Sequence, residues 1–219
     1  VIGQQPVAPS AIKNPSKSTA EVPRELSLEE IENIIDKFVD AAVRSKEAGF
    51  DGVEIHSAHG YLLNQFLSPL TNKRTDEYGG DIDGRIKIHL EIIRKIREKV
   101  GETYPIFIRM GAGDYLEGGL STEDSIHAAQ EFVKAGVDVL DISGGMCMFS
   151  IDDQRAGFFD FLSKPIYENV DVPVILTGGV KTGKDVEDIL NRGVCDLVGI
   201  GRSVFKDSNW IENEIKPLI

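Results

Sequence analysis

Five short apolar runs, each followed by a segment with helical spacing of apolar residues, constrain the fold of this 219-residue chain more than any other feature. The runs lie at residues 52–56, 105–110, 137–143, 172–177 and 196–200. Runs such as VPVILT and DLVGIG are apolar on both faces, which is typical of parallel strands covered by helices. Alternating strands and helices favour a parallel sheet with right-handed crossovers. The expected fold class is therefore α/β.

The apolar spacing also predicts the helices, and capping residues mark several of their ends. Ser27 and Glu30 form a capping box before the first helix, and Gly49 follows its last turn. The expected helices span residues 28–48, 85–100, 121–135, 161–169, 185–192 and 208–216, with one or two further helical turns at 61–66.

Three segments lack such periodicity. Residues 1–26 are rich in Pro, Ser and Lys, and we expect an extended loop that leads into a single domain covering residues 1–219. Residues 71–84 are a polar loop. Residues 144–160 form the longest undefined segment after the first one, and this length makes them a candidate lid or binding loop.

Composition excludes several classes of function. The net charge of −12 argues against a nucleic-acid surface, although it permits a local basic pocket for phosphate. No apolar run approaches the roughly 18 residues of a membrane span, and no signal peptide precedes the fold, so a cytoplasmic protein is expected. Cys147 and Cys195 lack the spacing of zinc or iron–sulfur ligands, which favours two reduced thiols and no metal site.

Polar groups follow the first predicted strand. His56 ends that strand, and His59 and Tyr61 lie in the loop after it. Ligands bind at this end of parallel sheets, and all three groups can donate a hydrogen bond without carrying a negative charge. The cluster suits the binding of a developing oxyanion followed by proton donation. Two alternatives remain: metal ligation, which would need further ligands, and purely structural roles.

A glycine-containing dipeptide ends each of the last two predicted strands. These dipeptides are Gly178-Gly179 and Gly201-Arg202. In TIM barrels these two loops form the usual phosphate site, because glycine lets backbone N–H groups approach and the following helix N-terminus adds partial positive charge. Arg202 can bind a phosphate through two hydrogen bonds. Each glycine element alone is weak evidence, whereas the pair at successive strand ends favours an anion site.

One long segment resembles a known family. Residues 49–74 read GFDGVEIHSAHGYLLNQFLSPLTNKR and continue into T-D-E-Y-G-G. This segment resembles the most recognisable part of the old yellow enzyme family, the NADH:flavin oxidoreductases, which are FMN-dependent TIM barrels. V-A-P-S-A-I, T-G-G-V and G-I-G-R also match family segments. The five units resemble the fourth to eighth of the family's eight, so the resemblance predicts a partial barrel.

The resemblance also implies a function and roles for particular residues. It implies an FMN-dependent ene-reductase that uses NADH or NADPH to reduce the C=C bond of an α,β-unsaturated carbonyl compound. His56 and His59 would hold the carbonyl oxygen, and Tyr61 or solvent would donate the proton. Arg109, which ends the strand IFIRM, would face the N1/O2 edge of the flavin. The alternative for Arg109 is an ion pair with a loop carboxylate such as Asp114.

By the same resemblance, Gly178, Gly179, Gly201 and Arg202 would hold the FMN phosphate. A second hypothesis is a truncated, non-catalytic barrel that binds a phosphate ligand or assembles with a partner chain. The strands at 52–56 and 196–200 would be the edges of an open sheet, so we expect them to pair with another copy or a complementary chain. Some family members carry an iron–sulfur cysteine cluster after the barrel, beyond the point where this sequence ends.

Overall fold

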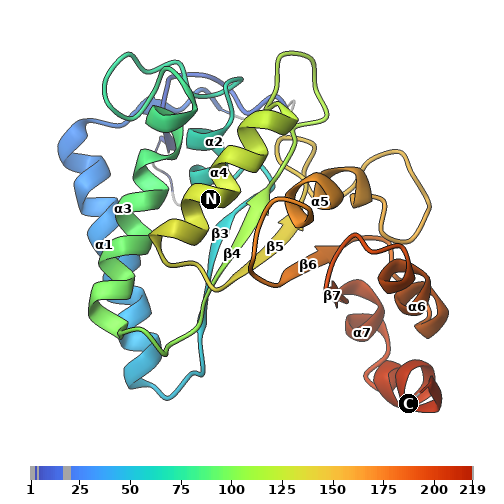
Figure 1. Ribbon diagram of the computed structural model, residues 1–219. Coiled ribbons are helices and arrows are strands. Elements are labelled where there is room, and N and C mark those ends of the chain that lie inside the picture. Colours follow the sequence, from blue (N-terminus) through green and yellow to red (C-terminus); the bar gives the residue numbers. More distant parts are fainter. Residues whose placement is uncertain (1–2, 4, 17–20, 219) are drawn as a thin grey trace.

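A curved, five-stranded parallel sheet forms the centre of the protein (Figure 1). The computed structural model describes residues 3, 5–16 and 21–218. Each strand pairs with the next one in sequence, in the order β3-β4-β5-β6-β7. The strands are β3 (Val53–Ser57), β4 (Ile106–Gly111), β5 (Val139–Ser143), β6 (Val174–Thr177) and β7 (Leu197–Gly199). The predicted parallel α/β class and the partial barrel of five βα units are confirmed.

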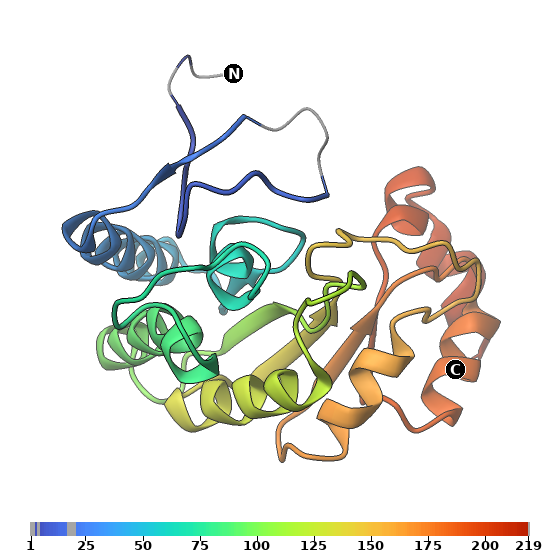
Figure 2. The ribbon, with the colours of Figure 1, turned by 90° about the horizontal axis from the view of Figure 1, so that it is seen from above.

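Helices cover the outer face of this sheet (Figure 2). The α-helices are α1 (Leu28–Glu47), α2 (Leu62–Leu67), α3 (Ile82–Val100), α4 (Thr122–Ala135), α5 (Asp160–Tyr167), α6 (Gly183–Asn191) and α7 (Arg202–Lys206). The capping box predicted before α1 is present, because the Ser27 hydroxyl accepts from the Glu30 N–H and the Glu30 carboxylate accepts from the Ser27 N–H. Local sequence signals therefore define the start of this helix.

Some helix boundaries differ from those predicted. Helix α3 begins three residues early, at Ile82, because the Asp81 carboxylate caps it through the Gly84 N–H. The helix predicted over 208–216 is present but shorter at its start, as a π-helix (Ile211–Ile215) followed by a 3₁₀ helix (Lys216–Leu218). Helix α7 was not predicted, since five residues are too few to show a periodic pattern.

Two short strands near the N-terminus form a small ribbon. Within the predicted loop of residues 1–26, β1 (Val7–Ala8) pairs in parallel with β2 (Arg24–Glu25). Arg74 anchors this ribbon, since its guanidinium donates to the carbonyl oxygens of Pro9 and Leu26 at 2.9 and 2.7 Å. Residues 1, 2, 4 and 17–20 of the predicted loop lie outside the described residues.

The two faces of the central sheet differ in polarity. Strand register aligns Ile55, Ile108, Leu140 and Val174 in one outer row, and all four are buried beneath the helices. The next row, on the inner face, contains His56, Arg109 and Asp141. Because side chains alternate along a strand, the same strands place apolar side chains beneath the helices on the outer face and polar side chains on the inner face. The polar row ends close to the loops that carry the candidate site.

Strands β3 and β7 are the two edges of the sheet. On β7, Leu197 is 49% exposed, and Phe205 on the following helix α7 is 94% exposed. No helix of residues 3, 5–16 and 21–218 has both the length and the apolar character needed to cross a lipid bilayer.

Candidate functional site

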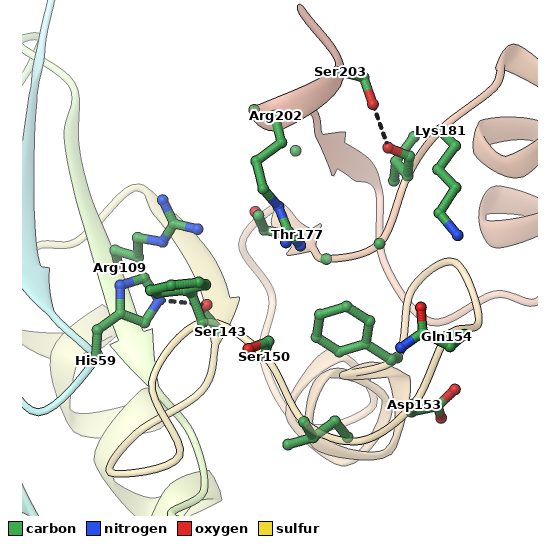
Figure 3. Close-up of a pocket in the computed structure, with 18 of the residues that line it drawn as sticks. His59, Arg109, Ser143, Ser150, Asp153, Gln154, Thr177, Lys181, Arg202 and Ser203 are labelled. Atoms are coloured by element: carbon green, nitrogen blue, oxygen red, sulfur yellow. Dashed lines mark hydrogen bonds between the residues drawn. The ribbon is translucent and has the colours of Figure 1, made fainter. Parts of the chain in front are cut away.

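A cavity of about 570 Å³ lies among the loops that follow the strands at their carboxyl ends (Figure 3). His59 and Arg109 line one end, and Gly179, Gly201 and Arg202 line the other. The sequence predicted both sets of residues at strand ends, and the family resemblance implied that they contact one FMN molecule. Parallel strand pairing brings both sets to one cavity, because it places all the carboxyl ends at one rim.

The histidine loop after β3 holds His59 in an unusual backbone conformation. His59 has φ +59°, in the left-handed region, and its N–H donates to the Gly144 carbonyl oxygen at 3.1 Å. Its Nε2 atom shares a hydrogen bond of 2.8 Å with the Ser143 hydroxyl. The imidazole is therefore fixed at both backbone and ring by residues at the end of β5 and just after it.

The two other predicted catalytic groups lie beside His59. The ring centroid of His56 lies 5.1 Å from that of His59 and 5.3 Å from that of Tyr61. His59 lines the cavity, whereas His56 and Tyr61 are not among the residues that line it. The structure thus brings the three residues together, and their catalytic roles stay predictions.

Both imidazoles are neutral at pH 7. Burial, followed by the nearby Arg109 guanidinium and His56, lowers the pKa of His59 to about 4. Burial and Arg109 likewise lower the pKa of His56. Each ring can therefore offer one N–H donor without bringing a positive charge. Across the part of the chain that the structure describes, no group of three or more His, Cys, Asp or Glu side chains could hold a metal ion.

Arg109 is a residue of β4, which lies between β3 and β5, and its side chain is on the inner face of the sheet. Its Nε atom is 3.4 Å from the Asp141 carboxylate, which accepts a hydrogen bond of 2.8 Å from Thr177. The carboxylate suggested from sequence, Asp114, binds other groups, so that partner was wrong. Asp141 was missed, although a carboxylate inside the apolar run VDVLDIS is a signal that could have identified it.

The glycines after β6 are closely packed at positive φ, whereas the glycine after β7 is open. Gly178 and Gly179 have φ of +148° and +71°, and a Cβ on Gly179 would lie 2.5 Å from the Arg155 carbonyl oxygen. A Cβ on Gly201 would meet no atom within 4 Å, so the backbone there lies bare toward the cavity. Arg202 begins α7 and also lines the cavity. Larger side chains would strain or cover this backbone.

Two lysines missed by the sequence interpretation add to this end of the cavity. Lys181 and Lys206 line it together with Arg202, and Asp153 is the acidic residue of the lining. Asp153 is already paired with Arg155, whose Nη2 atom lies 2.8 Å from it. The cavity is therefore locally cationic in a chain of net charge −12. Such a surface favours an anionic ligand.

Of the two helix N-termini that follow the glycine loops, that of α6 is already occupied. The Asp185 carboxylate accepts from the N–H groups of Lys181 and Thr182, each at 2.8 Å, at the start of α6. Glu214 accepts from the Gly183 N–H at 2.9 Å. Two carboxylates thus satisfy backbone N–H groups at the start of α6 that an anion could otherwise use.

The loop between β5 and α5 covers one side of the cavity. Phe149, Ser150, Ile151, Gln154 and Phe158 from this loop line it. The Phe149 ring lies edge-on to the His59 ring, with centroids 6.1 Å apart. The predicted lid or binding loop is therefore adjacent to the predicted catalytic histidines.

The fold and cavity together define a TIM-barrel protein of the kind whose ligands bind at the carboxyl ends of the strands. The model of the NADH:flavin oxidoreductase / NADH oxidase family matches residues 2–216. The chain belongs to this family, which confirms the resemblance to the old yellow enzymes.

Individual relatives agree with this assignment. An NADH oxidase from Thermoanaerobacter brockii is 44% identical over 229 residues, covering 99% of this chain and 35% of the relative. The structure of 2-naphthoyl-CoA reductase in complex with 2-naphthoyl-CoA matches with a TM-score of 0.87 and 29% identity, covering 96% of this chain and 33% of that one. An old yellow enzyme homologue from Zymomonas mobilis matches with a TM-score of 0.77 and 28% identity, covering 96% and 62%. The chain spans about a third of the length of the curated relatives it matches.

Proposed function

We propose that this chain supplies the substrate-oxygen and phosphate ends of the FMN site of an old yellow enzyme-type oxidoreductase. The full protein would use NADH or NADPH to reduce the C=C bond of an α,β-unsaturated carbonyl compound. One observation carries the proposal: a continuous cavity has His59 and Arg109 at one end and Gly179, Gly201 and Arg202 at the other.

The residues of the cavity fit FMN. The Arg109 Nε atom is buried and makes no hydrogen bond within the described residues, because its contact with Asp141 lacks hydrogen-bond geometry. A ligand atom at the inner face of β4 could accept from this guanidinium. At the other end, the bare backbone of Gly201 and the cations Arg202 and Lys181 suit a phosphate dianion. FMN, when bound, would supply the hydride chemistry.

The chain's own residues would bind and polarise the substrate. His56 and His59 are neutral donors that can hold a carbonyl oxygen where negative charge grows during reduction. Ser143 orients the His59 ring through their shared hydrogen bond. Tyr61 lies beside His56 and is the proposed proton donor, with solvent as the alternative. The loop that carries Phe149 would exclude water from this end.

A second candidate function is a non-catalytic barrel segment that binds a phosphate ligand or assembles with a partner chain. The unpaired outer edges of β3 and β7 favour it. The enzyme hypothesis also requires residues outside this chain, since the chain covers 62% of the Zymomonas mobilis homologue. We therefore expect little or no turnover from the 219-residue chain alone.

Titration with FMN and with inorganic phosphate, followed by calorimetry, tests the phosphate end. Arg202→Ala should weaken binding by about 10- to 100-fold, the effect of losing a charge-assisted hydrogen bond of ~1.5–3 kcal/mol. Lys184→Ala is the matched control, because Lys184 lies on exposed α6 and pairs with Asp188 at 3.0 Å. Equal affinity of the Arg202 variant and the control variant would contradict the assignment.

Product analysis in a protein that includes the rest of the barrel tests the reaction. NADH and NADPH are supplied separately, with an enone under nitrogen or with oxygen alone. Formation of the saturated carbonyl product supports ene-reduction. Cofactor oxidation that occurs only with oxygen would instead indicate an NADH oxidase activity.

A further inference from the structure

A buried carboxylate that is not part of the cavity lining joins the segments that follow β3, β4 and β5. Asp114 follows β4 and is 1% exposed. Its Oδ2 atom accepts from the Ser68 hydroxyl at 2.6 Å and from the Leu120 N–H at 2.9 Å, and its Oδ1 atom accepts from the Met146 N–H at 2.9 Å. These donors come from the end of α2, the loop before α4 and the loop after β5. One side chain therefore ties together segments that are distant in sequence.

Close packing around Asp114 shows that the loops are built to fit it. A Cβ on Gly145 would lie 2.5 Å from the Asp114 Oδ1 atom, and a Cβ on Gly119 would lie 2.6 Å from the Asp114 Cβ. The Gly145 N–H also donates to the Gly113 carbonyl oxygen at 2.8 Å. Glycine at positions 119 and 145 is thus required by the approach of this carboxylate.

One path from Asp114 leads to His59 through the loop after β5. Asp114 fixes the Met146 N–H, two residues beyond Gly144. The Gly144 carbonyl oxygen accepts from the His59 N–H at 3.1 Å, and the preceding Ser143 holds the His59 ring. The position of this loop therefore sets the backbone contact of His59, and the ring contact is made by the strand residue immediately before the loop.

A second path leads to His59 through α2. Ser68, whose hydroxyl donates to Asp114, also donates its N–H to the Asn64 carbonyl oxygen at 2.9 Å. The Asn64 side-chain oxygen accepts from the Gly60 N–H at 2.8 Å, immediately after His59. His59 is a non-glycine residue at φ +59°, and such a conformation persists only where surrounding contacts determine it. The two paths supply those contacts on both sides of the residue.

We propose that Asp114 is a positioning residue that holds His59 at the cavity by fixing the loops on both sides of it. Three donors to one carboxylate explain why an aspartate is needed there, since a serine or asparagine oxygen could not accept them all in the same geometry. The importance of His59 itself rests on the proposed function; the contacts that hold it do not.

The test compares Asp114→Asn with Asp138→Asn in the chain without flavin. Asp138 also accepts from several donors, the Arg97 guanidinium at 2.6 Å and the Ile106 N–H at 2.7 Å, but it lies at the opposite end of the sheet. Amide exchange by NMR should be at least tenfold faster at Met146 and His59 in Asp114→Asn. The NMR titration midpoint of the His59 imidazole should rise from about 4 by one unit or more as the ring becomes solvated.

Asp138→Asn should leave the His59 midpoint and both amides unchanged, even if it lowers the global stability as much. Equal effects of the two variants, or an unchanged His59 midpoint in a folded Asp114→Asn, would overturn the proposal. If Asp114→Asn does not fold, Ser68→Ala removes one of the three donors and should move the same signals by a smaller factor; no movement there would also overturn it. Neither readout needs FMN, so failure here is distinct from failure of the proposed reaction.

Discussion

The β3–β5 side of the sheet and the β6–β7 side are covered by helices of different lengths. On the side of β3 to β5, the helices α1, α3 and α4 have 20, 19 and 14 residues. On the side of β6 and β7, the helices α5, α6 and α7 have eight, nine and five residues, and none of the residues of α7 is buried. The histidine end of the cavity lies on the first side, and the proposed phosphate end lies on the second. We propose that protein outside this chain packs on the second side.

Burial makes the same contrast at the level of single side chains. Phe132 on α4 is fully buried and packs against His89 of α3, with ring centroids 5.2 Å apart. Phe205 on α7 is 94% exposed. An aromatic side chain left in water contributes little to folding, whereas one in a core contributes several kcal/mol. The two residues are thus a matched pair for measuring the difference between the sides.

The largest expected effect is the loss of stability in Phe132→Ala. Removal of a buried phenylalanine side chain costs about 3–5 kcal/mol, through lost burial and the cavity that remains. Phe205→Ala should change the free energy of unfolding by less than about 0.5 kcal/mol. Urea unfolding followed by circular dichroism measures both. Comparable losses in the two variants would show that α7 packs on the chain more closely than its exposure indicates.

The next effect concerns the histidine end in a protein that includes the whole barrel. Loss of one hydrogen-bond donor to a developing oxyanion typically costs ~2.7–4 kcal/mol, or about 10²–10³ in rate. His56→Ala should therefore slow alkene reduction far more than the reduction of the flavin by NADH or NADPH. Stopped-flow measurement of the two half-reactions separates them. Equal loss in both would indicate a structural histidine.

The free energy of unfolding should depend on pH through His89 of α3, on the β3–β5 side of the sheet. This imidazole is fully buried, shares a hydrogen bond of 2.8 Å with Ser57, and has its pKa lowered by burial to about 4. The unfolded chain, with an ordinary pKa near 6.5, takes up the proton first. Stability is therefore lost as the pH falls from about 6.5 to 4, by about 3 kcal/mol.

His89→Gln cannot titrate in this range, so its free energy of unfolding should fall less steeply between pH 6.5 and 4. The comparison is made by denaturant unfolding at several pH values. His59, with a pKa also lowered to about 4, contributes a similar slope and is removed in a His59→Gln background. A His89 variant with the slope of the parent would exclude this histidine as the source.

The sequence predicted the strands and long helices well because each is specified locally. Apolar runs, the capping box at Ser27 and the glycines after α1 and α4 are contained in a few consecutive residues. The start of α3 was misplaced because Asp81 caps it from inside a stretch that reads as a polar loop. The helix predicted at the C-terminus is present, but its π and 3₁₀ geometry was not predicted, and its residue Glu214 accepts a hydrogen bond from the distant Gly183 N–H.

The site shows the same division. Strand ends located His56, Arg109 and the glycine-containing dipeptides, since position in a βα unit is a local property. The partners of these residues are set by register and loop packing, which no single segment encodes. Asp141 reaches Arg109 through the alignment of β4 with β5, and Asp114 gathers donors from three loops. The sequence likewise did not predict that Lys181 and Lys206 line the same cavity as Arg202.

The smallest expected effect is on the association of this chain with other protein at the β7 edge of the sheet. Leu197 on β7 and Phe205 on α7 are both large, apolar and exposed, beside a strand with one unpaired edge. We expect the chain to self-associate or to bind a complementary chain there. Phe205→Ser should lower the sedimentation-derived association constant while leaving the free energy of unfolding within about 0.5 kcal/mol of the parent.

Phe50 offers the control for this experiment. It is 66% exposed and lies just before β3, at the opposite edge of the sheet. If association uses the β7 edge, Phe205→Ser weakens it and Phe50→Ser does not; if copies pair edge to edge as β3 against β7, both variants weaken it. A parent chain that sediments as a monomer at high concentration would contradict both arrangements, and would mean that exposed apolar groups at these edges do not suffice to recruit a second copy.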